Sequence, residues 1–215
     1  MAVNKIQRLL VTGLFCLLIS CCPSSLPPEQ YASWISDPTH GLVQQRQVAV
    51  FDMSLQYWTP EFRALRELGG VGTFSQTGFD SLSTANRESL YFIFTLGPTA
   101  GKAQGDAMYS GITNFKEYDQ RMRNLSFHLS EYWLLRLPDG REFPPVLATM
   151  EQTFGIAESR KMHLVFAPPD STTHFPLVDW WDIEFRDDIF GTGLHHFVYK
   201  KEDWGNLPSI KINLS

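Results

Sequence analysis

The stretch Leu42-Val-Gln-Gln-Arg-Gln-Val-Ala-Val-Phe-Asp-Met-Ser-Leu-Gln-Tyr-Trp58 gives the strongest fold signal in this sequence. Its second half alternates strictly, with Phe51, Met53, Leu55 and Tyr57 apolar and Asp52, Ser54 and Gln56 polar. Successive side chains of a β-strand point to opposite faces, so alternation predicts a strand with one face on a hydrophobic core. We expect a single half-buried strand of about a dozen residues.

A helix is predicted directly after this strand. Thr59 is a favourable N-cap, Pro60 suits the first helical position, and Gly69 follows the last apolar residue of the pattern. We expect two similar short helices, one over residues 29–35 and one opening after Asn114, where apolar side chains recur at steps of three and four: Phe115, Tyr118, Met122 and Leu125. Residues 71–86, rich in Gly, Ser and Thr, and residues 97–111 are predicted loops.

The carboxyl-terminal half has the pattern of β structure. Residues 90–96 form a short apolar run that fits a buried strand, and residues 127–137 fit one or two more. Pro138-Asp139-Gly140 predicts a hairpin turn leading into residues 142–150. Further strands are expected over residues 162–166, 177–185, 194–199 and 210–214. The sequence therefore predicts a mainly β, α+β fold: an antiparallel β-sandwich with two or three short helices in the N-terminal half.

The first 20 residues predict export. Lys5 and Arg8 precede an apolar segment, Leu-Leu-Val-Thr-Gly-Leu-Phe-Cys-Leu-Leu-Ile-Ser, at residues 9–20. This order is typical of a secretory signal peptide. A membrane-spanning helix needs about 20 apolar residues, and Pro23 follows the segment almost at once, so we expect cleavage rather than retention.

The end of the segment, Leu18-Ile19-Ser20-Cys21, resembles the lipobox of bacterial lipoproteins. A large aliphatic residue stands three positions before the cysteine, and a small residue stands directly before it. The resemblance implies diacylglyceryl transfer to Cys21, cleavage after Ser20 and acylation of the new amino terminus. The alternative is an ordinary signal peptide that ends beside cysteines. Residues 1–20 would then be the signal peptide, 21–28 the lipidated cysteine and its tether, and 29–215 a single globular β-rich domain.

The same resemblance predicts a destination. In the sorting scheme of Gram-negative lipoproteins, Asp after the lipidated cysteine retains the protein at the inner membrane. Cys22 stands there instead, so we expect a lipid anchor in the cell envelope, at the outer membrane. Beyond the lipobox, no motif in residues 29–215 identifies a family.

Composition excludes several classes of function. The chain of 215 residues is 43% hydrophobic and 13% aromatic, which is enough for one packed core. Its formal net charge of -5 becomes -7 when the two positive charges of Lys5 and Arg8 are removed, which argues against a nucleic-acid partner. Of three cysteines, Cys16 leaves with the signal peptide and Cys21 carries lipid, so no disulfide is expected.

Catalytic and metal motifs are incomplete. The loop Gly97-Pro-Thr-Ala-Gly-Lys-Ala103 has three residues between its glycines and Ala after Lys, whereas a phosphate-binding loop needs four residues and then Ser or Thr. No Gly-x-Ser-x-Gly nucleophile motif occurs. His195 and His196 are adjacent on a predicted strand and point to opposite faces, so they do not bind one ion together. We predict no metal, no cofactor and no catalytic residue.

The stretch Trp180-Trp-Asp-Ile-Glu-Phe185 looks like the strand of β-sandwich glycoside hydrolases that carries Glu-x-Asp-x-Glu. Asp182 and Glu184 match its last two positions, but Trp180 stands where the nucleophile belongs, so the two-carboxylate mechanism is incomplete. We interpret the segment as a strand with Trp181, Ile183 and Phe185 in the core and Trp180, Asp182, Glu184 and Arg186 facing outward.

Two functional hypotheses follow. The first is a lipid-anchored, non-catalytic envelope protein with a structural, assembly or ligand-binding role. Its partners would be the membrane, through the lipid on Cys21, and another envelope protein or a glycan. Aromatic and acidic side chains are the candidates for ligand contact: Trp180, Asp182, Glu184 and Trp204. The alternative is an envelope glycan hydrolase that uses Asp182 and Glu184.

Overall fold

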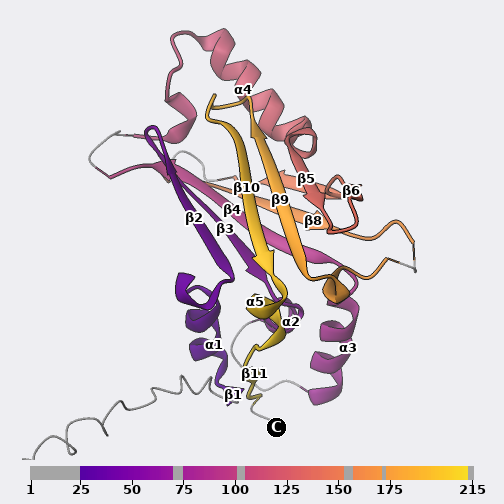
Figure 1. The fold of residues 1–215 in the computed structure, drawn as a ribbon. Coiled ribbons are helices and arrows are strands. Elements are labelled where there is room, and N and C mark those ends of the chain that lie inside the picture. Colours follow the sequence, from indigo (N-terminus) through magenta and orange to yellow (C-terminus); the bar gives the residue numbers. More distant parts are fainter. Residues whose placement is uncertain (1–24, 70–74, 101–104, 153–156, 171–172, 213–215) are drawn as a thin grey trace, which may run out of the picture.

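Two antiparallel sheets form the body of the protein in a computed structural model that describes residues 25–69, 75–100, 105–152, 157–170 and 173–212 (Figure 1). One sheet has the strand order β2-β3-β4-β8-β7 and the other β10-β9-β5-β6, while β1 and β11 form a separate parallel pair. The bounds are β1 (Ser25–Leu26), β2 (Val43–Val48), β3 (Phe51–Trp58), β4 (Leu90–Pro98), β5 (Trp133–Arg136), β6 (Glu142–Phe143), β7 (Leu147–Met150), β8 (Arg160–Phe166), β9 (Trp180–Asp187), β10 (Gly193–Lys200) and β11 (Ser209–Ile210).

Helices flank the sheets at both ends of the molecule (Figure 1). They are α1 (Pro28–Ile35), α2 (Pro60–Glu67), α3 (Gln76–Asn86), α4 (Phe115–Phe127) and α5 (Lys201–Gly205), with short 3₁₀ turns η1 (Pro38–His40), η2 (Ala107–Tyr109), η3 (Leu129–Tyr132) and η4 (Phe175–Leu177). The expected α+β class with antiparallel sheets is confirmed, but the fold is not mainly β, because helices and strands occupy similar shares of the described residues. The expectation that helices keep to the N-terminal half is wrong, because α4 and α5 lie in the second half.

The stretch 42–58 forms two strands rather than the single strand that we expected. β2 pairs with β3 in a register that sets Val48 opposite Phe51, which leaves Ala49 and Val50 as the turn. Ala49 has a φ of 53°, in the left-handed region. A two-residue turn leaves the period-two alternation intact, and neither turn residue is the Gly or Asn that would reveal it. The expected core face of β3 is confirmed, because its apolar members are buried.

Ala49 offers a test of this turn. A non-glycine residue in the left-handed region destabilises the folded state by about 1–2 kcal/mol. Replacing it with glycine removes this strain, but the greater conformational entropy of glycine in the unfolded chain offsets about 0.5–1 kcal/mol of the gain. Ala49→Gly should therefore raise the free energy of unfolding in urea by about 0.5–1 kcal/mol. The same change in β7, Ala148→Gly, should lower it. A destabilising Ala49→Gly would show that the turn is not left-handed.

Capping side chains begin helices α2 and α4, as the sequence predicts. The Thr59 hydroxyl accepts from the N–H of Phe62 at 3.2 Å at the start of α2, with Pro60 at the first helical position. The Asn114 side chain accepts from the N–H of Glu117 at 3.1 Å at the start of α4. These bonds satisfy N–H groups that have no partner within a helix. The helix expected over residues 29–35 is present as α1, which begins one residue earlier, at Pro28.

Helix α3 occupies residues that we predicted as loop. Gly78, with several Ser and Thr residues, gives this segment a low intrinsic helix propensity. It is stabilised by packing against α2, where the Asn86 amide donates to Glu67 Oε1 at 3.1 Å, and by the burial of Phe79 in the core. Tertiary packing therefore overrides local propensity here. Residues 71–74 of the predicted loop lie outside the described residues.

The predicted hairpin after β5 is present, but its second arm is divided. The N–H of Leu137 donates to the carbonyl of Arg141 at 3.0 Å across the turn. β6 pairs with β5, whereas β7 pairs with β8 in the other sheet. Pro144-Pro145 lies between them and lacks the N–H groups needed to continue a ladder. α4 and η3 also occupy residues 127–132, where we expected a strand.

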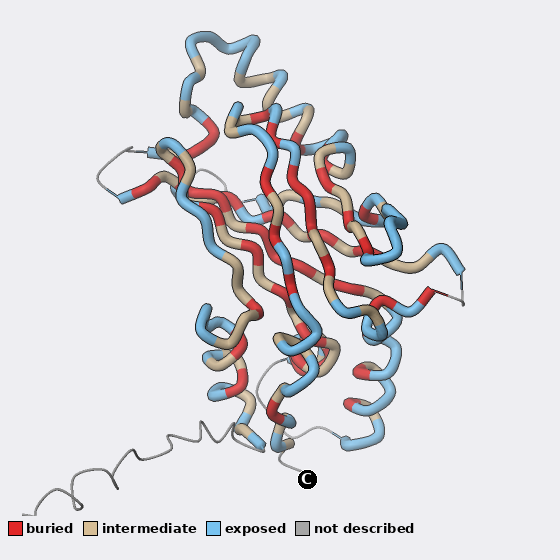
Figure 2. Tube along the Cα trace, viewed as in Figure 1, coloured by how far each residue is buried: buried red, intermediate tan, exposed pale blue. Residues whose placement is uncertain are grey.

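Aromatic side chains join the two sheets. The ring centroid of Phe94 on β4 lies 4.8 Å from that of Trp133 and 5.0 Å from that of Phe185. Phe92, two residues earlier, lies 5.3 Å from Tyr199 and 6.4 Å from Trp181. All of these rings are buried, and buried positions alternate along the strands in Figure 2. Each fully buried aromatic side chain contributes about 1.5–3 kcal/mol of hydrophobic stabilisation.

The described chain begins and ends at one end of the molecule. β1 runs parallel to β11, with Ser25 opposite Ser209. Helices α1, α2 and α3 lie toward this end, and α4 lies at the opposite end (Figure 1). Among the described residues, no helix has the length and apolar character that crossing a membrane requires.

A buried carboxylate organises the loop between β9 and β10. Asp187 is 1% exposed and accepts from the N–H groups of Ile189 at 3.1 Å and Phe190 at 2.8 Å. The Thr192 hydroxyl donates to Asp187 and lies 2.8 Å from His195 Nε2. Burial lowers the pKa of His195, although Asp187 opposes the shift. Burial likewise lowers the pKa of His163, which contacts the Tyr91 hydroxyl at 2.6 Å.

These two histidines predict an acid-sensitive fold. A depressed pKa means that the unfolded chain binds more protons, so stability is lost as the pH falls from about 6.5 toward the lower folded pKa. The free energy of unfolding should be lower at pH 5.5 than at pH 7.5. His195→Gln should reduce that difference, and adding His163→Gln should reduce it further. If the difference were the same in the wild type and the double variant, other groups would account for it.

Candidate ligand-binding face on the four-stranded sheet

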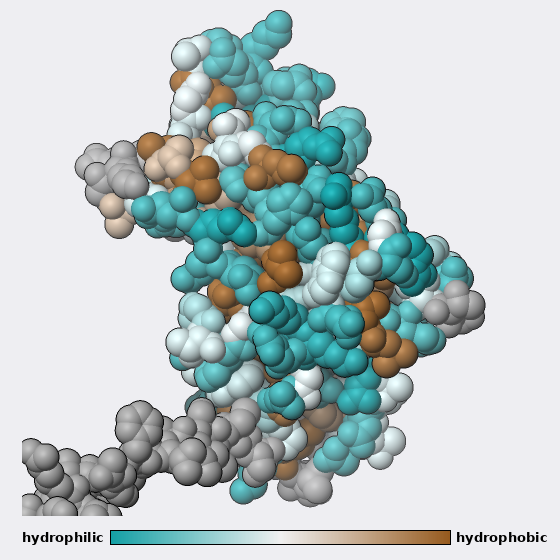
Figure 3. Space-filling view, in the orientation of Figure 1, coloured by the Kyte–Doolittle hydropathy of each residue, from teal (hydrophilic) through white to brown (hydrophobic). Residues whose placement is uncertain are grey.

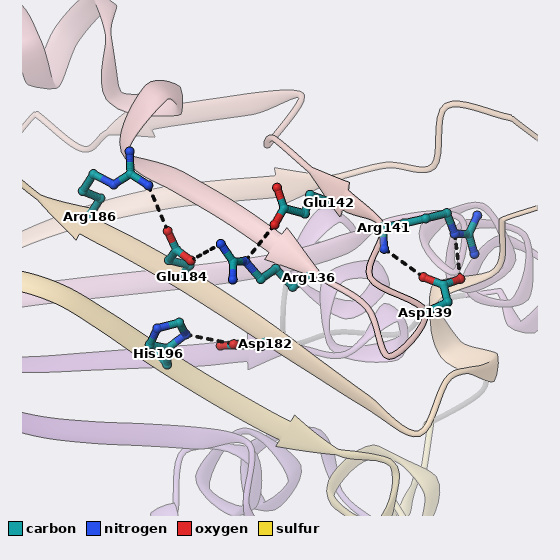
Figure 4. A network of polar contacts seen from close by, with 8 residues as sticks. All are labelled: Arg136, Asp139, Arg141, Glu142, Asp182, Glu184, Arg186 and His196. Carbon is teal, nitrogen blue, oxygen red and sulfur yellow. Dashed lines mark hydrogen bonds and ion pairs between the residues drawn. The ribbon is translucent and has the colours of Figure 1, made fainter.

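The outer face of the four-stranded sheet brings together polar side chains from all four of its strands (Figure 4). The predicted alternation of β9 is confirmed: Trp181, Ile183 and Phe185 are buried in the core, and the intervening side chains point the other way. In the register of the sheet, Arg136 of β5 lies opposite Asp182, and His196 of β10 lies opposite Glu184. Residues far apart in the sequence therefore share one surface.

Asp182 and His196 form one pair on this face. His196 Nδ1 donates to Asp182 Oδ2 at 2.8 Å, and the Asp182 side chain is 16% exposed. The second oxygen, Asp182 Oδ1, is shielded from solvent and has no hydrogen-bond partner among the described residues. Buried carboxylate oxygens are ordinarily satisfied by a donor, so this oxygen has unused accepting capacity.

Glu184 lies beneath two arginines. Its side chain is 4% exposed, with Oε2 at 2.9 Å from Arg136 Nη2 and Oε1 at 3.4 Å from Arg186 Nη2. Arg136 Nη2 and Glu184 Oε2 are close enough to form an ion pair, but their relative orientation does not make a hydrogen bond. Arg136 Nε also lies 3.1 Å from Glu142 Oε1. Both oxygens of Glu184 therefore face cations, and the carboxylate has a structural role in this conformation.

This arrangement predicts unequal effects for two glutamates that contact the same arginine. Glu184→Gln removes a buried charge between two guanidinium groups and should lower the free energy of unfolding by about 1–2 kcal/mol, since both arginines remain partly hydrated. Glu142→Gln removes a half-exposed partner and should change it by less than about 0.5 kcal/mol. Urea denaturation of both variants measures the difference. Equal effects would contradict a structural role for Glu184.

A shallow groove of about 600 Å³ lies beside this network, at the Trp180 end of β9. Trp180 is half-buried and lies opposite Lys200 of β10, and Val198 is 43% exposed. We call this depression the Trp180 groove; its lining residues are Asp179, Trp180, Asp182, Val198, Lys200, Lys201 and Glu202. The surface over β9 and β10 is mostly hydrophilic, with small separate hydrophobic patches (Figure 3). Asp182 belongs to both the groove and the polar network.

The structure separates the four side chains that we nominated for ligand contact. Trp180 and Asp182 line the same groove, whereas Glu184 is covered by arginines. Trp204 on α5 stacks on the buried Trp181 with ring centroids 3.6 Å apart, so one of its faces packs on the core. Its exposure is intermediate rather than full.

Sequence reasoning missed the neighbours that complete this face. Arg136 and His196 come from other strands, and Lys200 and Val198 follow His196 on β10. One part of this face could have been predicted from the sequence. Residues 188–192 form a short connection between β9 and β10, and the antiparallel register across it places His196 opposite Glu184. Within the described ranges, no group of three or more His, Cys, Asp or Glu residues is arranged to hold a metal. Cys21, the predicted lipidation site, lies outside those ranges.

Comparisons with known proteins give few matches. No family model and no curated protein matches the sequence. A protein of unknown function from Burkholderia pseudomallei is 13% identical, with a TM-score of 0.38, over 86% of this chain and 94% of that one. A DUF4426 family protein from Pseudomonas aeruginosa is 8% identical, with a TM-score of 0.32, over 74% of this chain and 93% of that one. Neither likeness assigns a ligand or an activity to this chain.

Proposed function

We propose that this chain is a lipid-anchored protein of the bacterial cell envelope with a non-catalytic, ligand-binding role. The observation that carries the proposal is Leu18-Ile19-Ser20-Cys21 at the end of the apolar segment 9–20. Three acyl chains on one cysteine would anchor the domain firmly, because each buried methylene contributes about 0.8 kcal/mol and a single chain is only marginal. The outer membrane is the proposed destination, since Cys22 rather than Asp follows.

The position of β1 supports a close approach of the domain to the bilayer. Ser25, the first residue of β1, stands four residues after Cys21. An extended chain spans about 3.3 Å per residue, so this linker reaches about 13 Å. The end with α1 and the β1–β11 pair would therefore face the membrane, and α4 would point away from it (Figure 1).

We further propose that the two sheets form the β-sandwich that the sequence predicts. The rings of Phe92 and Phe94 contact side chains of β5, β9 and β10, which supports face-to-face packing. The outer face of the smaller sheet is then free of the core and available for ligand contact.

Binding is better supported than glycan hydrolysis. Glycoside hydrolysis needs two carboxyl groups that reach the substrate, and Glu184 is 4% exposed with an arginine against each oxygen. Trp180 also occupies the position of the nucleophile in the hydrolase pattern. The site therefore supports contact with a ligand without chemistry on it.

Lipid attachment is tested by replacing its acceptor. Cys21→Ser should abolish palmitate labelling, leave an uncleaved precursor and reduce co-sedimentation with membranes. Cys22→Ser is the matched control and should keep both the label and the membrane fractionation. Labelling that persists in Cys21→Ser, or is lost equally in Cys22→Ser, would contradict the proposed anchor.

A further inference from the structure

We propose that the Trp180 groove binds a neutral pyranose oligosaccharide, with the Trp180 indole as a stacking platform and the Asp182 carboxylate as a hydroxyl acceptor. This inference rests on the proposed ligand-binding role and names the ligand class for that site. Three features of the groove support this ligand class: an indole with no aromatic partner among the described residues, mixed charges, and a carboxylate oxygen that has no hydrogen-bond partner among those residues.

The indole of Trp180 is available for stacking. Trp181 and Trp204 cover each other in a parallel stack with an interplanar angle of 7°. By contrast, in the part of the chain that the structure describes, no aromatic ring packs on Trp180. Val198 extends the apolar surface from the neighbouring strand. The C–H faces of pyranose rings suit a flat aromatic surface that is apolar in its body and polar at its edge.

The charges around the groove favour a neutral ligand. Its carboxylates, on Asp179, Asp182 and Glu202, are nearly balanced by the ammonium groups of Lys200 and Lys201. Lys200 Nζ lies 3.8 Å from Glu202 Oε1, so these two charges partly offset each other. A polyanion would require a surface of one positive sign. Adjacent donors and acceptors instead match sugar hydroxyl groups, which both donate and accept.

Asp182 contributes a hydrogen-bond acceptor to the lining of the groove. Its Oδ2 is fixed by His196 Nδ1 at 2.8 Å, while Oδ1 has no partner among the described residues. Oδ1 is shielded from solvent in this conformation, so the Asp182 side chain must rotate toward the groove before a ligand hydroxyl donates to it.

The shape of the groove favours a glycan chain over a single sugar. Sites for small molecules enclose most of the ligand surface. This groove is open and shallow, so a monosaccharide would remain largely in solvent. An oligosaccharide gains additional contacts along the surface of β9 and β10.

Isothermal titration of the mature, lipidated protein in detergent tests the inference, with β-1,4-linked N-acetylglucosamine tetramer and cellotetraose as the probes. We expect saturable binding of at least one of them. Trp180→Ala should weaken that binding about tenfold or more, and Asp182→Asn should weaken it about threefold. Phe115→Ala is the control, because Phe115 is 79% exposed on α4 at the other end of the molecule, and it should bind as the wild type does.

Three results would overturn the inference: no binding of either probe by the wild type, unchanged binding by Trp180→Ala, or equal weakening by Phe115→Ala. Thermal unfolding of each variant shows whether the fold is intact, and Asp182→Asn provides a second measurement if Trp180→Ala is destabilised. Membrane fractionation of the wild type and Cys21→Ser is independent of glycan binding. Failure of this inference is therefore distinguishable from failure of the proposed anchor.

Discussion

The contact of Phe92 and Phe94 with the smaller sheet is the interaction on which the rest of the structure depends. These two rings on central strand β4 meet rings from β5, β9 and β10, and all of them are buried. A shift of one residue in any of these strands would move its apolar side chains to solvent. Packing of the core therefore determines that Trp180 and Asp182 on β9 point outward. The side chains on the outer face of the smaller sheet follow from how its inner face packs against the larger sheet.

The sequence predicted the starts of those helices that have a capping side chain at their first turn. Thr59 and Asn114 are caps that act within one turn, so the starts of α2 and α4 follow from the sequence alone. Helix α3 was not predicted, because the Asn86–Glu67 bond and the burial of Phe79 depend on other segments of the chain. The Ala49 turn was missed for a different reason: its backbone adopts a left-handed conformation without a residue that favours it. Local sequence patterns therefore do not reveal either the packing that stabilises α3 or the turn at Ala49.

The candidate face on the four-stranded sheet was also predicted only in part. Period-two alternation was enough to place Trp180, Asp182 and Glu184 on one side of β9. It carried no information about what covers them. The burial of Glu184 comes from Arg136 on another strand, and the orientation of Asp182 comes from His196 across the hairpin. Trp204 was expected to contact a ligand, but it packs on the core by stacking on Trp181. Site chemistry depends on register, which a single strand pattern does not specify.

The parallel pairing of β1 with β11 has a consequence for the order in which this protein acquires its structure. Ser25 pairs with Ser209, so the first strand of the described chain joins a partner made 184 residues later. Closing so long a loop is entropically costly, and the ladder itself contains only two residues on each side. β1 therefore has no partner until nearly the whole chain has been synthesised. In a chain exported amino terminus first, the segment that crosses the membrane earliest would be among the last to become ordered.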